Sequence, residues 1–279
     1  MLRSRSAVRA LTRDQRDAAL ELCAREPVMN VFVAARLEEW NGRSEQAFAH
    51  IERGRLAAVC WASANVVPVA ASAESQRAFA TALAGRRSRT ASIFGPREQV
   101  AGIWERLEPE WGRKRTLRDV QPVMAAHVRP SLLGAERDER VRLARPEEVD
   151  LVMPAAAHMF TSEIGYAPYT GSPRYYRQAL ADLIRRERTY VIVDRGEVVF
   201  KTDVGSLAQG CAQLQGVWMS PHLRGRGLAA PALAAVMEDV MTRLAPVVCL
   251  YVNDFNLPAR ALYRRLGFDD AGTYQTVIL

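Results

Sequence analysis

The sequence predicts an α/β (α+β) protein whose two halves repeat one order of elements. Short apolar runs bounded by Gly, Pro and charged residues predict strands, and longer segments with apolar residues three and four positions apart predict helices. Each half contains two helices, a hairpin, a strand, a helix, a second strand and a further helix. Only the second half has a turn rich in Gly and Arg between a strand and a helix. These observations predict one architecture used twice, with a ligand-binding turn in the second copy.

The first half begins with helices predicted over 14–25 and 28–40. A hairpin over 48–62 is expected to turn at Arg53 and Gly54, because Gly suits a tight turn between strands. The elements that follow are a strand over 66–70, a helix over 74–83, a strand near Ile93, a helix over 96–111 and a strand over 120–128.

The second half follows a linker over 129–140, where Pro, Gly and charged residues cluster. It contains a loop over 165–173 that is rich in Gly, Pro and Tyr, and a hairpin that turns at Arg195 and Gly196. Its strands are predicted near Val141 and over 189–194, 198–203, 211–219 and 247–252, with a short terminal strand before Leu279. Its helices are predicted over 146–159, from the loop to about Arg188, after the turn at 224–229, and between Pro258 and Gly267.

The composition of the 279 residues, 49% hydrophobic and 25% charged, is typical of a globular protein with a sizeable core. No apolar run reaches the roughly 20 residues that span a bilayer, and the N-terminus lacks the pattern of a signal peptide, so we expect a cytoplasmic protein without a membrane partner. The net charge of +7 comes mainly from dispersed arginines, which predicts no nucleic-acid partner. The scattered cysteines and histidines predict no metal site.

The turn that opens the helix after strand 211–219 is suited to an anion. Glycines let the backbone approach a ligand closely, and the N–H groups of the first helical turn point outward. Two arginines add positive charge, so the turn suits a pyrophosphate. The residues predicted to bind it are Arg224, Gly225, Arg226, Gly227, Leu228 and Ala229.

This turn resembles the phosphate-binding signature of the GNAT superfamily of N-acyltransferases, which consists of an arginine, two variable residues, a glycine, one variable residue and an alanine. Arg224, Gly227 and Ala229 match that signature. A second segment is similar to that superfamily's later cofactor motif through Asn256, Ala259, Leu262, Tyr263, Gly267 and Phe268. The resemblance implies two GNAT-like domains, each a mixed, mostly antiparallel sheet flanked by helices. It further implies acetyl-coenzyme A (acetyl-CoA) as co-substrate, no metal, and direct transfer of the acetyl group to a primary amine on a small molecule or peptide.

A dinucleotide-binding reading competes with this one, because Gly225, Gly227 and Ala230 also fit the glycine fingerprint of Rossmann domains and Asp254 ends the next strand. A Rossmann domain needs several more strand and helix units after its fingerprint. Here only one helix and a short strand remain before Leu279.

The first half lacks the phosphate turn, since its strand over 66–70 is followed by Ala71, Ser72, Ala73 and Glu74. We therefore predict a degenerate GNAT-like domain over 1–130, with a structural or substrate-shaping role, and a catalytic domain over 139–279. The arrangement is similar to an uncharacterised bacterial tandem GNAT family and more distantly to mycothiol synthases. Oligomeric state is left open.

Acyl transfer needs a proton for the departing thiolate, and Tyr263 is the candidate donor because a phenol is protonated at neutral pH. From spacing alone, a tyrosine packed on an amphipathic helix is the favoured explanation, whereas the surrounding family pattern favours the proton donor. By resemblance, the backbone of Val217, Trp218 and Met219 holds the pantetheine arm and polarises the thioester. Asn256 contacts that arm or caps the following helix.

The general base is less constrained by the sequence. Glu163 is the first candidate, in the loop before Gly165, where partial burial would raise its pKa; an exposed loop carboxylate is the alternative. His222, Asp203 and His158 also remain candidates. A different class of function, an acyl-CoA sensor that docks a partner with little catalysis, fits the same cofactor motifs.

Overall fold

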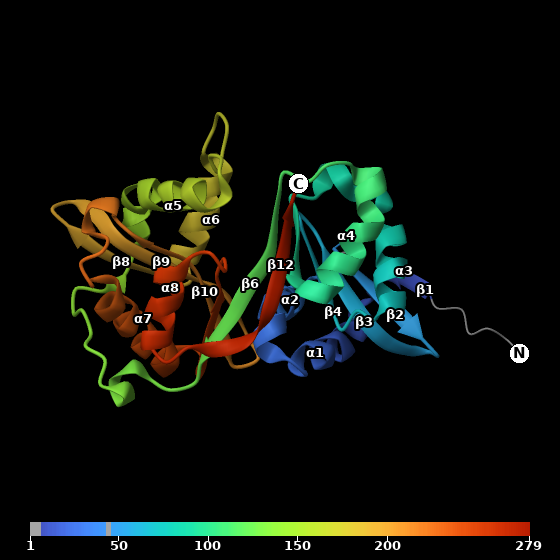
Figure 1. Ribbon diagram of the computed structural model, residues 1–279, viewed down its shortest axis with the longest axis horizontal. Coiled ribbons are helices and arrows are strands. Elements are labelled where there is room, and N and C mark those ends of the chain that lie inside the picture. Colours follow the sequence, from blue (N-terminus) through green and yellow to red (C-terminus); the bar gives the residue numbers. More distant parts are fainter. Residues whose placement is uncertain (1–6, 43–45) are drawn as a thin grey trace, which may run out of the picture. The chain divides into compact units, whose positions relative to one another are not determined.

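The structure is a computed structural model that describes residues 7–42 and 46–279, and these residues form two compact units (Figure 1). The first unit contains the described part of 1–124 together with 251–257 and 270–279. The second contains 125–250 and 258–269. No helix among the described residues is both long and apolar enough to cross a membrane.

The sheet of the first unit is mixed and mostly antiparallel. Its strands occur in the spatial order β1-β2-β3-β4-β5-β12-β6, with β4 and β5 parallel. The strands are β1 Ala7–Ala10, β2 Ala47–Glu52, β3 Arg55–Ala62, β4 Asn65–Val69, β5 Ser92–Pro96, β6 Thr116–Ala126 and β12 Asp269–Ile278. The helices are α1 Arg16–Ala24, α2 Pro27–Glu38, α3 Ala73–Leu83 and α4 Arg97–Trp111.

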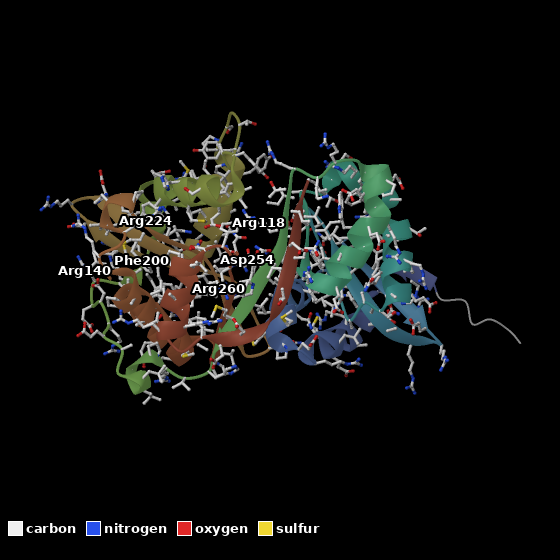
Figure 2. The ribbon with its side chains drawn as sticks, in the orientation of Figure 1. Arg118, Arg140, Phe200, Arg224, Asp254 and Arg260 are labelled. Carbon is white, nitrogen blue, oxygen red and sulfur yellow. The ribbon has the colours of Figure 1, made fainter. Side chains whose placement is uncertain are left out.

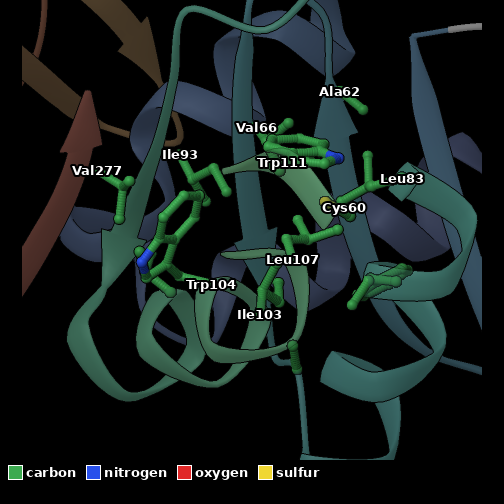
Figure 3. Packing of buried hydrophobic residues seen from close by; sticks show 14 of the residues in the cluster. Cys60, Ala62, Val66, Leu83, Ile93, Ile103, Trp104, Leu107, Trp111 and Val277 are labelled. Atoms are coloured by element: carbon green, nitrogen blue, oxygen red, sulfur yellow. The ribbon is translucent and has the colours of Figure 1, made fainter. Parts of the chain in front are cut away.

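The core of the first unit follows from the alternation of side chains along β3. Ala58, Cys60 and Ala62 are buried in one cluster with residues of α3 and α4, such as Phe79 and Leu107 (Figure 3). Successive strand residues point to opposite faces of the sheet. The buried residues that alternate with Ala58, Cys60 and Ala62 therefore face the other side of the sheet, where α1 packs on β3. Helices therefore cover both faces of this sheet.

The second unit has the strand order β11-β10-β9-β8-β7, and only its β10 and β11 are parallel. Its strands are β7 Arg142–Leu143, β8 Thr189–Asp194, β9 Glu197–Ala208, β10 Cys211–Met219 and β11 Val247–Tyr251. Its helices are α5 Val149–Ile164, α6 Arg174–Arg185, α7 Ala229–Arg243 and α8 Leu257–Arg265. Both units thus have the mixed, mostly antiparallel sheet flanked by helices that the resemblance implied.

Strand β8 shows how the second unit is layered. Val191 belongs to a core cluster with residues of α5 and α6, including Val152 and Ile184. The neighbouring Tyr190 points the opposite way, and its hydroxyl donates a hydrogen bond of 2.6 Å to Asp239 on α7. Helices α5 and α6 therefore cover one face, and α7 covers the other.

The compact units differ from the contiguous ranges 1–130 and 139–279. The terminal strand β12 pairs antiparallel with β5, from Tyr274 opposite Pro96 to Ile278 opposite Ser92, so the last residues complete the sheet of the first unit. The pairing of strands distant in sequence depends on register and burial in the folded chain, which a single linear sequence does not reveal. The predicted order of elements matches the structure apart from β1, which was not predicted. The terminal strand belongs mainly to the first unit and not to the second.

Candidate active site

Strand β10 loses its parallel partner halfway along its length. It pairs with β11 only over Cys211–Gln213, opposite Val247–Cys249, yet it continues to Met219 against β9. Beyond Gln213 the two parallel strands separate. Val217, Trp218 and Met219 therefore lie on the part of β10 that β11 does not pair, where backbone groups facing β11 are available to a ligand.

A bulge lies in this separated part of β10. Gln215 is opposite Asp203 and Trp218 is opposite Lys201, so Gly216 and Val217 together face one residue of β9. Gly216 has φ +62°, a conformation that glycine adopts without the steric penalty of a side chain. Thr202 stabilises the bulge through a hydrogen bond of 3.1 Å from its hydroxyl to the Gln215 carbonyl. The bulge bends the strand at the point where the partner is lost.

The predicted phosphate turn follows directly. After the 3-10 turn Pro221–Leu223, Gly225 and Gly227 have φ of +73° and +77°. A Cβ on either glycine would meet no atom within 4 Å, so both face open space. Arg224, labelled in Figure 2, donates from Nε to the Met219 carbonyl at 2.9 Å, which ties the turn to the end of β10. Arg226 is exposed. The result is an open turn that carries positive charge and that a ligand can approach closely.

Helix α7 begins at Ala229 without a side-chain cap. Its N-cap residue Leu228 makes no capping hydrogen bond, and its first turn carries no acidic residue. Pro231, third in the helix, has no N–H, and the remaining first-turn donors, with the positive end of the helix dipole, favour an anion.

Helix α3 occupies the corresponding place in the element order of the first unit and has the opposite character. The Ser72 hydroxyl accepts a hydrogen bond from the Ser75 N–H at 3.2 Å, and Glu74 adds negative charge to the first turn. Its N-terminal donors are thus partly satisfied, and a phosphate would meet a carboxylate. The first half therefore lacks the phosphate turn and also has a helix N-terminus that disfavours an anion.

Tyr263 and Glu163 lie near one another in the second unit. Tyr263 on α8 is 7% exposed, and its ring contacts that of Phe268 with centroids 5.7 Å apart. Burial, and secondarily the negative charge of Glu163, raise the pKa of the Tyr263 phenol above its ordinary value. Among the described residues none accepts a hydrogen bond from its hydroxyl. The phenol is therefore protonated at neutral pH and makes no hydrogen bond to another described residue.

Glu163 differs from its expected setting. It belongs to the last turn of α5, not to a loop, because the helix continues to Ile164 and ends at Gly165, whose φ is +89°. Its side chain is exposed, so the expected partial burial is absent. A glycine in the left-handed conformation is a common helix stop, and its position after Ile164 was the signal for the longer helix.

The other base candidates have partners. Trp218 donates from Nε1 to His158 Nδ1 at 3.1 Å, which uses the lone pair of that nitrogen. The Trp218 side chain is packed in the core, so only its backbone remains for a ligand. His222 is exposed, and its Nδ1 lies 2.9 Å from the Ser220 hydroxyl.

Asn256 immediately precedes α8, and its N–H donates to the Asn253 carbonyl at 3.0 Å.

Asp203 lies in a buried ion pair that the sequence analysis did not identify. Lys201 Nζ contacts Asp203 Oδ2, and the Thr189 hydroxyl donates to Asp203 Oδ1 at 2.8 Å. Burial and the Asp203 charge raise the pKa of Tyr176 to about 12. One signal was available, namely a lysine within an apolar strand of a chain in which 36 of the 38 basic residues are arginines.

Among the described residues, one group of potential metal ligands comes together, in the first unit, where ligand atoms of His50, Glu52 and Glu74 lie within 4.8 Å of one another. The buried His50 already has Nδ1 2.9 Å from the Ser75 hydroxyl. This hydrogen bond explains the position of the imidazole without an ion.

Two family models match parts of the chain. Residues 157–268 match the model of the acetyltransferase (GNAT) family, and residues 45–152 match a domain of unknown function, DUF4081. No curated protein matches the chain.

Solved structures share the fold over almost the whole chain. A Drosophila protein is 13% identical with a TM-score of 0.68 and coverage of 99% of both chains. A GCN5-related N-acetyltransferase from Sphaerobacter thermophilus is 18% identical with a TM-score of 0.60, covering 99% of this chain and 96% of its own. A tandem GNAT protein from the clavulanic acid biosynthesis pathway is 12% identical with a TM-score of 0.55 and covers 98% of both chains. The solved structures show the shared fold, and the family model places the resemblance to GNAT acetyltransferases in residues 157–268.

Proposed function

We propose that the protein is an N-acetyltransferase that moves an acetyl group from acetyl-CoA directly to a primary amine in a ternary complex. The observation that carries the proposal is the sequence of features along β10 and α7. The strand separates from β11 after Gln213, bulges at Gly216, and leads through two open glycines to an uncapped helix. A thioester, its extended arm and its pyrophosphate match these features in order.

The turn over 224–229 would bind the pyrophosphate through its backbone N–H groups and the α7 dipole, with Arg226 adding charge. The backbone of Val217, Trp218 and Met219 would hold the arm and polarise the acyl carbonyl. Arg224 would act indirectly, because its Nε bond to the Met219 carbonyl keeps the turn against the strand end. Asn256, directly before α8, is the proposed contact to the arm.

Tyr263 is the proposed general acid. Its raised pKa keeps the phenol protonated at neutral pH, and its hydroxyl has no competing acceptor among the described residues. Glu163 is the proposed base, acting directly or through a water molecule on the acceptor ammonium. An exposed carboxylate beside the phenol can pass the amine proton to solvent.

We assign binding of the pyrophosphate and of the thioester to the second unit. The first unit has Ser72 and Glu74 at the helix end where a phosphate would bind, which favours a structural or substrate-shaping role for that copy. The expected stoichiometry is one acetyl-CoA per chain.

The test is isothermal titration of the purified protein with acetyl-CoA and, separately, with NAD(P)H, followed by thiol release in the presence of a panel of amines and peptides. Selective binding of acetyl-CoA at one site per chain, with amine-dependent thiol release, would support the proposal. Absence of acetyl-CoA binding would refute it. Tight binding without thiol release for any amine would favour an acyl-CoA sensor.

A further inference from the structure

Lysine is almost excluded from this chain. Of 38 basic residues, 36 are arginines, and the two lysines are Lys114 and Lys201. A bias of this strength would place arginine at any position where only a positive charge is required. A lysine within an apolar strand therefore indicates a requirement for a compact ammonium or for an amine, which a guanidinium cannot provide.

Lys201 lies beneath the bulge of β10. Its side chain is 2% exposed, and a Cβ placed on Gly216 would lie 3.5 Å from Lys201 Nζ and 3.8 Å from Asp203 Oδ2. Met159 of α5 closes the same space, with Cε 2.8 Å from that Cβ position. The lysine amine thus lies under the segment of β10 to which the acyl group has been assigned.

The Lys201 amine is in contact with a carboxylate that can accept a proton. Asp203 contacts Nζ, and Thr189 holds the other carboxylate oxygen at 2.8 Å. Asp203 is thus positioned to accept a proton from the Lys201 amine, which would leave a neutral, nucleophilic amine beneath the bulge.

We propose that Lys201 is an internal acceptor, so that the protein acetylates its own Lys201 from bound acetyl-CoA. The inference rests on the proposed function. The Lys201 ammonium gives one proton to Asp203, and its nitrogen forms a bond to the thioester carbonyl carbon while the carbon–sulfur bond breaks. The thiolate receives the second nitrogen proton, and Asp203 returns its proton to solvent. The products are an amide at Lys201 and free coenzyme A.

This reaction is a modification, not a step of amine turnover, because an amide is too stable to pass its acetyl group onward. It would remove the positive charge and leave the Asp203 carboxylate with Thr189 as its remaining partner in this site. The charge beneath the bulge would then become negative, so acetylated protein should differ from unmodified protein in its kinetics with the acceptor amine.

Lys114 offers an internal control. It lies in the first unit, is paired with Glu108 at 2.7 Å, and its side chain is 29% exposed. Chemical acetylation by a thioester in solution would favour the more accessible amine, Lys114. Acetylation from a bound cofactor would favour the buried Lys201.

The experiment is incubation of the full chain with acetyl-CoA, followed by proteolysis and mass spectrometry of the two lysine peptides, with the binding titration and amine-dependent thiol release measured on the same preparation. We expect a gain of one acetyl mass on Lys201 and not on Lys114, at a rate that does not change on dilution of the protein. The Gly227→Glu variant, which blocks the phosphate turn, should show none. The Lys114→Arg variant should behave as wild type.

Binding and thiol release without acetylation of Lys201 would overturn the inference and leave the proposed function intact. Acetylation of Lys114 in preference to Lys201, or equal acetylation of Lys201 in Gly227→Glu, would show a chemical side reaction and would also overturn it. Absence of acetyl-CoA binding would remove the proposed function and the inference together. The assay needs no substitution at Lys201, so a variant that fails to fold cannot obscure the result.

Discussion

Gly227→Ala separates the conformational role of the phosphate turn from its contact with a ligand. Gly227 has φ +77°, and a Cβ there would meet no atom within 4 Å. The methyl group therefore causes no collision within the protein, and the cost to folding is that of a left-handed alanine, about 1 kcal/mol. The same methyl group would enter the space assigned to the pyrophosphate. We expect acetyl-CoA affinity to fall about 10- to 100-fold, or about 1.4–2.8 kcal/mol.

Gly196→Ala is the matched control. Gly196 lies in the hairpin between β8 and β9 with φ +80°, and a Cβ there also meets nothing within 4 Å. Both variants should lose the same stability in denaturant unfolding, but only Gly227→Ala should weaken binding in isothermal titration. Equal acetyl-CoA dissociation constants for the two variants would contradict the assignment of the phosphate to this turn.

Three further results are expected. Tyr263→Phe should lower kcat by about 100-fold with little change in acetyl-CoA affinity. The control Tyr190→Phe, which loses a 2.6 Å hydrogen bond to Asp239, should lose about 1 kcal/mol of stability and retain turnover. Equal kcat values for Tyr263→Phe and wild type would exclude Tyr263 as the general acid. Glu148, held by two 2.7 Å bonds from Arg142, has its pKa lowered to about 2. Glu148→Gln should therefore reduce the unfolding free energy by about 1–2 kcal/mol at neutral pH after solvent screening. Because the pKa of Glu148 is depressed in the folded state, the difference in unfolding free energy between wild type and Glu148→Gln should disappear as the pH falls from 4.5 to about 2 in denaturant titrations. A difference that persisted at about pH 2 would contradict its origin in the ion pair. Leu107→Ala, at a core position 1% exposed, should destabilise the first unit by about 2–5 kcal/mol in the same titrations and leave acetyl-CoA affinity unchanged. Weakened affinity would argue against assigning the pyrophosphate and the thioester to the second unit alone.

Much of the site was predictable because it depends on local chemistry. The glycines at 225 and 227 adopt positive φ, as a turn before a helix requires, and Ala229 begins α7 where the apolar spacing begins. The GNAT resemblance is confirmed by the family match over 157–268. The roles of Tyr263, Glu163 and Asn256 stay predictions.

Other features could not be inferred from local pattern. Glu163 became helical because Gly165, a few residues beyond the expected end, is the residue that stops α5. His158 and Asp203 remained base candidates until the structure gave them Trp218 and Lys201 as partners. Partners separated by 60 positions, as Trp218 and His158 are, meet only through the packing of a helix on a sheet.

The sequence by itself determined most of the order of elements, the glycine turn before α7 and the helix that carries Tyr263, because spacing, capping and turn conformation act over a few residues. Tertiary structure decided the rest. It joined β12 to the sheet of the first unit, separated β10 from β11 after Gln213, and placed Lys201 beneath the bulge. Strand register, burial and charge pairing depend on which distant segments share a sheet, and that choice is made by the packing of the whole chain.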